Sequence, residues 1–150
     1  MLYFSYGMNT NAYQMACRCP EAKDLGRAIL LTHTFEFKGH ATIDESVTDQ
    51  VYGVLWDITD NNEKSLDLLE GYPYYYNKKE VTVLHNRKLV TAMTYFMYSD
   101  EKLSMPATHY FDMLKEGYLE HNIPLHQIED AFDRAEVAKY DRDELTNYAY

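Results

Sequence analysis

The order of its β-rich and helical segments is the feature that most limits how this chain can fold. Strand-favouring residues gather in runs in the first two thirds of the chain, at 2–6, 34–37, 41–43, 51–56, 80–84 and 89–98. The last two runs should form a hairpin that turns at 85–88. Helical patterns lie at 12–17, 59–70, 107–121 and 125–139, and Pro106 suits the first turn of the third helix. The strands thus come mostly first and the two longest helices last, without the regular alternation of βαβ units. This order predicts an α+β domain.

The chain shows no sign of an internal boundary. Its 150 residues suit one compact domain, which would bury about two thirds of the surface that the unfolded chain exposes. No repeat, low-complexity tract or linker rich in Pro, Gly or Ser interrupts the sequence. We therefore expect a single domain over residues 1–150.

Charge and composition narrow the range of partners. Fourteen basic and 24 acidic residues give a net charge of −10, and such a field repels nucleic acid and anionic lipid. No run approaches the roughly 20 apolar residues of a membrane helix, and the first residues lack a basic leader. Cys17 and Cys19 are only one residue apart, which is poor geometry for a disulfide. These features predict a cytoplasmic protein that binds neither nucleic acid nor membranes.

A glycine loop follows the first predicted strand. Tyr6, Gly7, Met8 and Asn9 join that strand to the helix predicted over 12–17. Backbone amides at such a junction can point outward without partners and so hold a carboxylate or an oxyanion. Most glycines after a strand only form a turn, and both interpretations stay open on the spacing alone.

The helix predicted over 59–70 has clear signals at both ends. Thr59 is a suitable N-cap, with Glu63 as its capping-box partner. Gly71 stands where a C′ glycine belongs. The helix should therefore end at Glu70.

Glu70 is a candidate acid/base group. The helix macrodipole disfavours negative charge at a C-terminus, and Leu66 and Leu69 could partly desolvate the carboxylate. Both effects would raise its pKa towards the range useful for proton transfer at neutral pH. The alternative is an ordinary solvated glutamate at a helix end.

Four segments, in order over nearly the whole chain, carry a family resemblance. They are YFSYGMN at 3–9, ATI at 41–43 leading to VYGVLW at 51–56, LDLLEGYP at 66–73 with Tyr76, and Pro106 with Tyr110, Gly117 and Pro124. Together they resemble the γ-glutamyl cyclotransferase family.

The resemblance implies a small α+β fold around a barrel-like mixed sheet flanked by helices. It implies that the loop amides bind a γ-glutamyl head and that the glutamate of an EG pair, here Glu70, is the acid/base. Tyr76 and Tyr110 would line the pocket. Met8 stands where the family usually has serine. The substitution removes a hydroxyl that could influence which substrate binds, but it leaves the main-chain amides in place.

The implied reaction cyclises a γ-glutamyl group to 5-oxoproline and releases an amine. Glu70 would take the proton of the α-ammonium group, and the amides of Gly7, Met8 and Asn9 would stabilise the tetrahedral oxyanion. The substrate would be a γ-glutamyl amino acid or γ-glutamylamine, with no metal or cofactor. We expect a monomer or a homodimer.

Other functions remain as alternatives. The first is a non-catalytic binding module that keeps the anion pocket, and the second is an interaction protein that works through its acidic, tyrosine-rich surface. A zinc or Cys–His site from the two cysteines with His33 or His40 lacks ligand spacing. Cys17, on a helix, is instead expected in the core, and the six histidines are expected to be ordinary surface or hydrogen-bonded residues. The aromatic run at 72–76 suggests a pocket rim better than a nucleic-acid surface, given the net charge.

Overall fold

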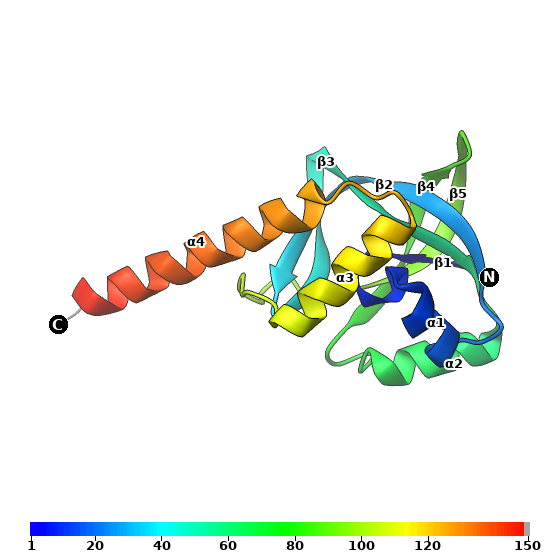
Figure 1. The fold of residues 1–150 in the computed structure, drawn as a ribbon, viewed down its shortest axis with the longest axis horizontal. Helices are drawn as coiled ribbons and strands as arrows, with labels where there is room; N and C mark the ends of the chain where they lie inside the picture. The colour runs from blue at the N-terminus through cyan, green and yellow to red at the C-terminus, as the bar shows by residue number, and fades with distance from the viewer. Residues whose placement is uncertain (149–150) are drawn as a thin grey trace.

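Five strands form a closed barrel, with the helices packed around it (Figure 1). The computed structural model describes residues 1–148. The strands are β1 (Leu2–Ser5), β2 (Lys23–Lys38), β3 (His40–Asp57), β4 (Asn77–His85) and β5 (Lys88–Phe96), in the barrel order β1-β3-β2-β4-β5. Strand β1 is antiparallel to β3 and parallel to β5. The α+β class and the barrel-like mixed sheet are therefore confirmed.

The hairpin of β2 and β3 is longer than the sequence predicted. The two strands have 16 and 18 residues, whereas the pattern indicated only short strands at 34–37, 41–43 and 51–56. The ladder shifts register between Asp24 and Arg27 and again between Leu31 and His33. Each shift interrupts the alternation of inward and outward side chains, so the apolar pattern breaks although the strand continues.

The hairpin of β4 and β5 confirms the predicted turn at 85–88. His85 pairs with Lys88, and the two residues between them, Asn86 and Arg87, have φ of 49° and 67°. Two successive positive φ values are the mark of a type I′ turn, whose twist suits a tight hairpin. The turn forms although the favoured Asn-Gly pair is absent.

Strand β1 closes the barrel and is anchored on both sides. Four of its residues pair with β3, and Tyr3 pairs with Met93 of β5. The Thr94 hydroxyl donates to the Phe4 carbonyl at 2.7 Å. These bonds fix the point from which the glycine loop departs.

Three short helical segments surround the end of β1: the 3₁₀ turn η1 (Met8–Thr10), α1 (Ala12–Arg18) and α2 (Asp60–Leu69). Thr59 caps α2, but its capping-box partner is Asn62, not Glu63. Asn62 is the third helical residue after this cap, where the reciprocal bond is made. The C-terminal prediction is confirmed: Glu70 is the C-cap and Gly71 has φ of 64°.

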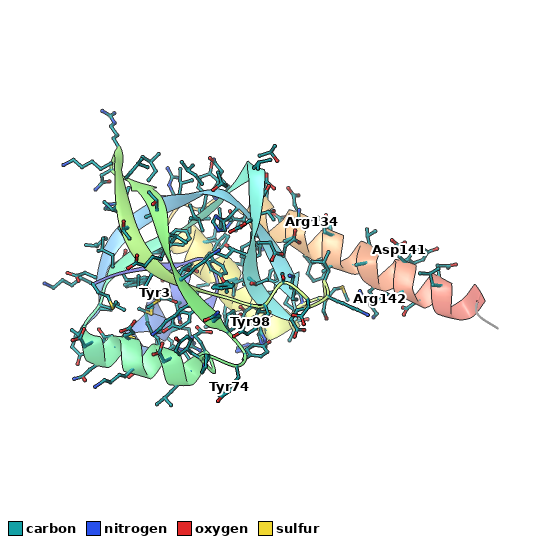
Figure 2. All side chains as sticks on the ribbon, turned by 180° about the vertical axis from the view of Figure 1, so that it is seen from behind. Tyr3, Tyr74, Tyr98, Arg134, Asp141 and Arg142 are labelled. Atoms are coloured by element: carbon teal, nitrogen blue, oxygen red, sulfur yellow. The ribbon has the colours of Figure 1, made fainter. Side chains whose placement is uncertain are left out.

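Two further helices complete the chain, α3 (Thr108–Glu120) and α4 (His126–Tyr148). Pro106 precedes the N-cap Ala107 and so lies outside the first turn where it was expected. Helix α4 also runs past residue 139 and away from the barrel (Figures 1 and 2). Buried Ile128, Ala131 and Ala135 hold its first half. Its second half mixes strong helix formers such as Ala138, Lys139 and Arg142 with weaker ones such as Asp141 and Asp143, and the helix continues there after the apolar pattern has stopped.

Helix α3 presses closely on η1. A Cβ atom on Gly117 would come within 2.4 Å of the Thr10 hydroxyl and 2.7 Å of the Asn11 amide, so this approach requires glycine. The Tyr118 hydroxyl donates to the Tyr6 carbonyl at 2.6 Å. Within residues 1–148, no helix is both long and apolar enough to cross a membrane.

Candidate active site

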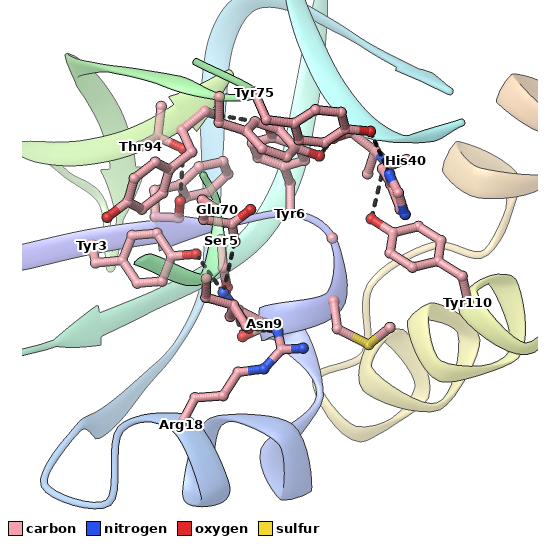
Figure 3. Close-up of a pocket in the computed structure, with 17 residues that line it drawn as sticks. Tyr3, Ser5, Tyr6, Asn9, Arg18, His40, Glu70, Tyr75, Thr94 and Tyr110 are labelled. Atoms are coloured by element: carbon pink, nitrogen blue, oxygen red, sulfur yellow. Dashed lines mark hydrogen bonds between the residues drawn. The ribbon is translucent and has the colours of Figure 1, made fainter. Parts of the chain in front are cut away.

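A cavity of about 320 Å³ lies where the end of β1, the end of α2 and the start of β3 meet (Figure 3). Its lining residues are Tyr3, Phe4, Ser5, Tyr6, Gly7, Met8, Asn9, Arg18, His40, Ala41, Leu69, Glu70, Tyr75, Tyr76, Thr94, Tyr95 and Tyr110. All seven residues predicted from the sequence are among them: Tyr6, Gly7, Met8, Asn9, Glu70, Tyr76 and Tyr110. The fold thus gathers three distant segments around one space.

Glu70 is the only carboxylate among the lining side chains. Burial raises its pKa from 4.5 to about 7, while the Arg18 charge and a hydrogen bond from Asn9 oppose the rise. Desolvation is thus the main cause, as expected, but Leu69 is 47% exposed and shields the carboxylate less than the sequence suggested. At neutral pH this carboxyl group can both accept and donate a proton.

The buried Asn9 side chain connects the loop to its neighbours. Its Nδ2 donates to Glu70 Oε1 at 3.3 Å and to the Tyr3 hydroxyl at 3.0 Å. Its Oδ1 accepts from Arg18 Nη1 at 2.6 Å. Because Arg18 can only donate, it fixes which end of the Asn9 amide faces the carboxylate.

The loop amides are available to a ligand. In the described residues, the N–H groups of Gly7, Met8 and Asn9 make no hydrogen bond, as expected for the first turn of a short helix. The Ser5 hydroxyl donates a hydrogen bond to the Asn9 carbonyl at 2.9 Å and so helps to fix the loop. A Cβ atom on Gly7 would lie 3.0 Å from the Ala41 Cβ and 3.3 Å from the Tyr110 hydroxyl, so glycine allows the loop to approach these two residues closely.

Six of the 17 lining residues are tyrosines, and their hydroxyls take part in hydrogen bonds. Tyr6 donates to the Tyr95 carbonyl at 2.5 Å, and Tyr76 donates to the Ala41 carbonyl at 2.6 Å. Tyr110 accepts from the Ala41 amide at 3.0 Å. Burial raises the pKa of all three predicted tyrosines. They therefore remain protonated at neutral pH and act as a rigid, largely apolar wall.

The opposite end of the cavity from Arg18 is aromatic (Figure 3). His40 Nδ1 lies 2.5 Å from the Tyr75 hydroxyl, and its ring packs edge-on against Tyr110 with centroids 4.9 Å apart. Burial lowers the pKa of His40, so the ring is neutral at pH 7. Both His40 and Tyr75 are partly open to solvent and mark the mouth.

Comparison with known proteins identifies the family. The family model described as "Gamma-glutamyl cyclotransferase, AIG2-like" matches residues 3–113. A gamma-glutamylcyclotransferase from Bos taurus is 33% identical over 138 residues, which cover 83% of this chain and 73% of the relative. The chain belongs to this family.

Other relatives agree. The gamma-glutamylcyclotransferase of Homo sapiens is 31% identical over 83% of this chain and 73% of its own length. A solved structure named gamma-glutamyl cyclotransferase superposes with a TM-score of 0.77 at 28% identity, covering 93% of this chain and 86% of that one. The resemblance stated from the sequence is therefore confirmed.

Ten of the 17 lining residues were not predicted as site residues from the sequence, and Tyr3, Arg18, His40 and Tyr75 are the ones among them whose polar groups bear most on the site. A signal existed for Arg18, which follows the buried Met15 by three residues and so lies on the same face of α1. His40 was taken as an ordinary histidine, since nothing in the sequence places the start of β3 beside the segment after α2.

The cysteines also differ from expectation. Cys17 was expected to lie in the core, but it is exposed, whereas Cys19 is buried. Within the described residues, no group of three or more His, Cys, Asp or Glu side chains is arranged to hold a metal ion.

The raised pKa of Glu70 predicts a pH-dependent effect on stability. The folded state holds this proton up to about pH 7 and the unfolded state only to about 4.5, so ionisation increasingly opposes folding across that window. Glu70→Gln removes this penalty. Its stabilisation relative to wild type should therefore be larger at pH 8 than at pH 5, by roughly 2–3 kcal/mol, measured by urea unfolding. Glu45→Gln, an exposed carboxylate, is the control. A Glu70→Gln effect that does not change with pH would contradict the burial.

Proposed function

We propose that this protein is a γ-glutamyl cyclotransferase that converts a γ-glutamyl amino acid or γ-glutamylamine to 5-oxoproline and a free amine. One observation carries the proposal: a carboxyl group with a pKa of about 7 lines the same cavity as the Gly7–Asn9 loop, whose N–H groups have no hydrogen-bond partner among the described residues. The names of the relatives agree with it.

Charge assigns an orientation to the substrate. Arg18 is the only cationic side chain among the lining residues at neutral pH, so it is the natural partner of the α-carboxylate. The α-ammonium group then lies towards Glu70, and the γ-carbonyl oxygen towards the amides of Gly7, Met8 and Asn9. Met8 contributes its main chain to this scheme, so the missing serine hydroxyl does not prevent it.

The reaction requires one base and one oxyanion site. Ionised Glu70 takes a proton from the α-ammonium group, and the freed amine attacks the γ-carbon to form the ring C–N bond. The loop amides stabilise the tetrahedral oxyanion. As the intermediate collapses, Glu70 gives its proton to the departing nitrogen and the bond to that nitrogen breaks. The ionised Glu70 then takes the second proton from the ring nitrogen and passes it to the released amine, which leaves as an ammonium ion and restores the carboxylate. No step requires a metal or cofactor, and holding the substrate folded lowers the entropic part of the barrier.

Glu70→Gln should abolish turnover while leaving the fold intact. The change removes the proton shuttle with little change in volume, and general acid–base groups contribute about 10²–10⁴-fold. Release of 5-oxoproline from a set of γ-glutamyl compounds is the measurement, with circular dichroism as the check on folding and Glu116→Gln, exposed on α3, as the control. Turnover at the wild-type rate would exclude Glu70 as the base. Ligand binding without any 5-oxoproline, in wild type as well, would instead support the binding module.

The pH profile should follow the same carboxyl group. The base must be ionised, so kcat/KM should fall about tenfold per pH unit below about pH 7 and level off above it. A profile flat between pH 5.5 and 8 would contradict this assignment.

Substitution of Arg18 should shift the midpoint of the pH dependence of kcat/KM. The charge of Arg18 lowers the pKa of Glu70, so Arg18→Ala should shift the midpoint to higher pH, whereas Arg18→Lys keeps a positive charge and should shift it less. Both variants should raise KM, since Lys lacks the paired donors that Arg offers to a carboxylate. An unchanged midpoint in Arg18→Ala would show that the arginine does not act on the base.

A further inference from the structure

The end of the cavity opposite Arg18 determines which leaving amine the substrate can carry. If the proposed function holds, Arg18 fixes the α-carboxylate at its own end, beside Asn9 and Glu70. The γ-carbonyl then lies at the loop, and the departing amine must extend towards His40 and Tyr75 (Figure 3). The chemistry of this mouth therefore decides which amines fit.

The mouth offers aromatic surface. His40 packs edge-on against Tyr75 and Tyr110, with ring centroids 5.7 and 4.9 Å apart. Tyr75 in turn packs on Tyr76 at 5.1 Å. Four rings from β3, α3 and the segment after α2 thus form one continuous surface, and such rings favour apolar or aromatic contacts.

The mouth does not offer positive charge. None of the lining side chains at this end is cationic at neutral pH, because burial lowers the pKa of His40. The Glu101 carboxylate is close enough to raise the pKa of the Tyr75 hydroxyl, which places a negative field at the same end. An amino acid leaving group would bring its own carboxylate into this field with no cationic lining side chain beside it, and like charges repel each other.

We propose that the mouth formed by His40 and Tyr75 receives the departing amine and selects amines that carry an aromatic or apolar body and no carboxylate. This inference rests on the proposed function and narrows its substrate to γ-glutamylamines of that kind. His40 and Tyr75 act as specificity-determining residues and take no part in proton transfer.

Four substrates test the inference in wild type. The γ-glutamyl conjugates of ethylamine and alanine differ only in the leaving carboxylate, and so do those of phenethylamine and phenylalanine. In each pair the conjugate without the carboxylate should have a kcat/KM about tenfold higher at low ionic strength, mainly through KM, and the phenethylamine conjugate should exceed the ethylamine conjugate. Amino acid nitrogens are less basic and leave more readily, so chemical reactivity works against the expected preference.

Two variants should move the preference in defined ways. His40→Arg supplies the missing counterion and should raise the kcat/KM of the phenylalanine conjugate relative to the phenethylamine conjugate by about tenfold. Tyr75→Ala should remove most of the advantage of phenethylamine over ethylamine. Tyr74→Ala, at an 88% exposed neighbour outside the cavity lining, should leave all four substrates unchanged.

The outcomes separate the two proposals. If none of the four conjugates gives 5-oxoproline, the proposed function fails and this inference fails with it. If all are cyclised but the amino acid conjugates react equally well or better, the function stands and the inference is overturned. Unchanged selectivity in both His40→Arg and Tyr75→Ala, with folding confirmed by circular dichroism, would also overturn it.

Discussion

The pairing of β1 on both of its edges is the constraint on which the site depends. β3 on one side and β5 on the other close the barrel around this four-residue strand. Trp56 Nε1 donates to the Ser5 hydroxyl at 3.0 Å, and that hydroxyl donates to the Asn9 carbonyl at 2.9 Å. A continuous set of bonds thus leads from the barrel wall to the loop. The amide array of the loop is rigid because the strand before it cannot shift.

The pKa of Glu70 results from two opposing effects. Removal from water favours the neutral acid, whereas Arg18 and the amide of Asn9 favour the carboxylate. Burial alone would place the pKa above about 7, and full solvation would leave a carboxylate too weakly basic to take a proton readily. The intermediate value requires both, so the Asn9–Arg18 contact tunes the same group that the loop positions.

Much of this arrangement could be predicted because its signals are local. The capping residue Thr59 and the C′ glycine Gly71 define a helix that can end only near Glu70, and the glycine loop follows directly from a strand pattern. The long β2–β3 hairpin could not be predicted, since its register shifts erase the alternation on which strand prediction depends. Nor could the position of His40, which faces Tyr75 across 35 residues of sequence because the barrel closes. Arg18 could have been predicted only from its spacing of three residues from Met15 on the same helix.

Six of the chain's 15 tyrosines line the cavity, where a tyrosine meets two physical requirements at once. A wall that raises the pKa of a carboxyl group must exclude water, yet the barrel edge exposes backbone carbonyls that need donors. A tyrosine meets both needs, with an apolar ring towards the cavity and a hydroxyl donated to a carbonyl, as Tyr6 does to Tyr95 and Tyr76 does to Ala41. Phenylalanine would leave those carbonyls without a donor, and a histidine or acid would add a second group titrating near pH 7. Because the tyrosines do not titrate near pH 7, Glu70 remains the group in the wall that transfers protons. The aromatic rings at the mouth are part of the same tyrosine-rich wall.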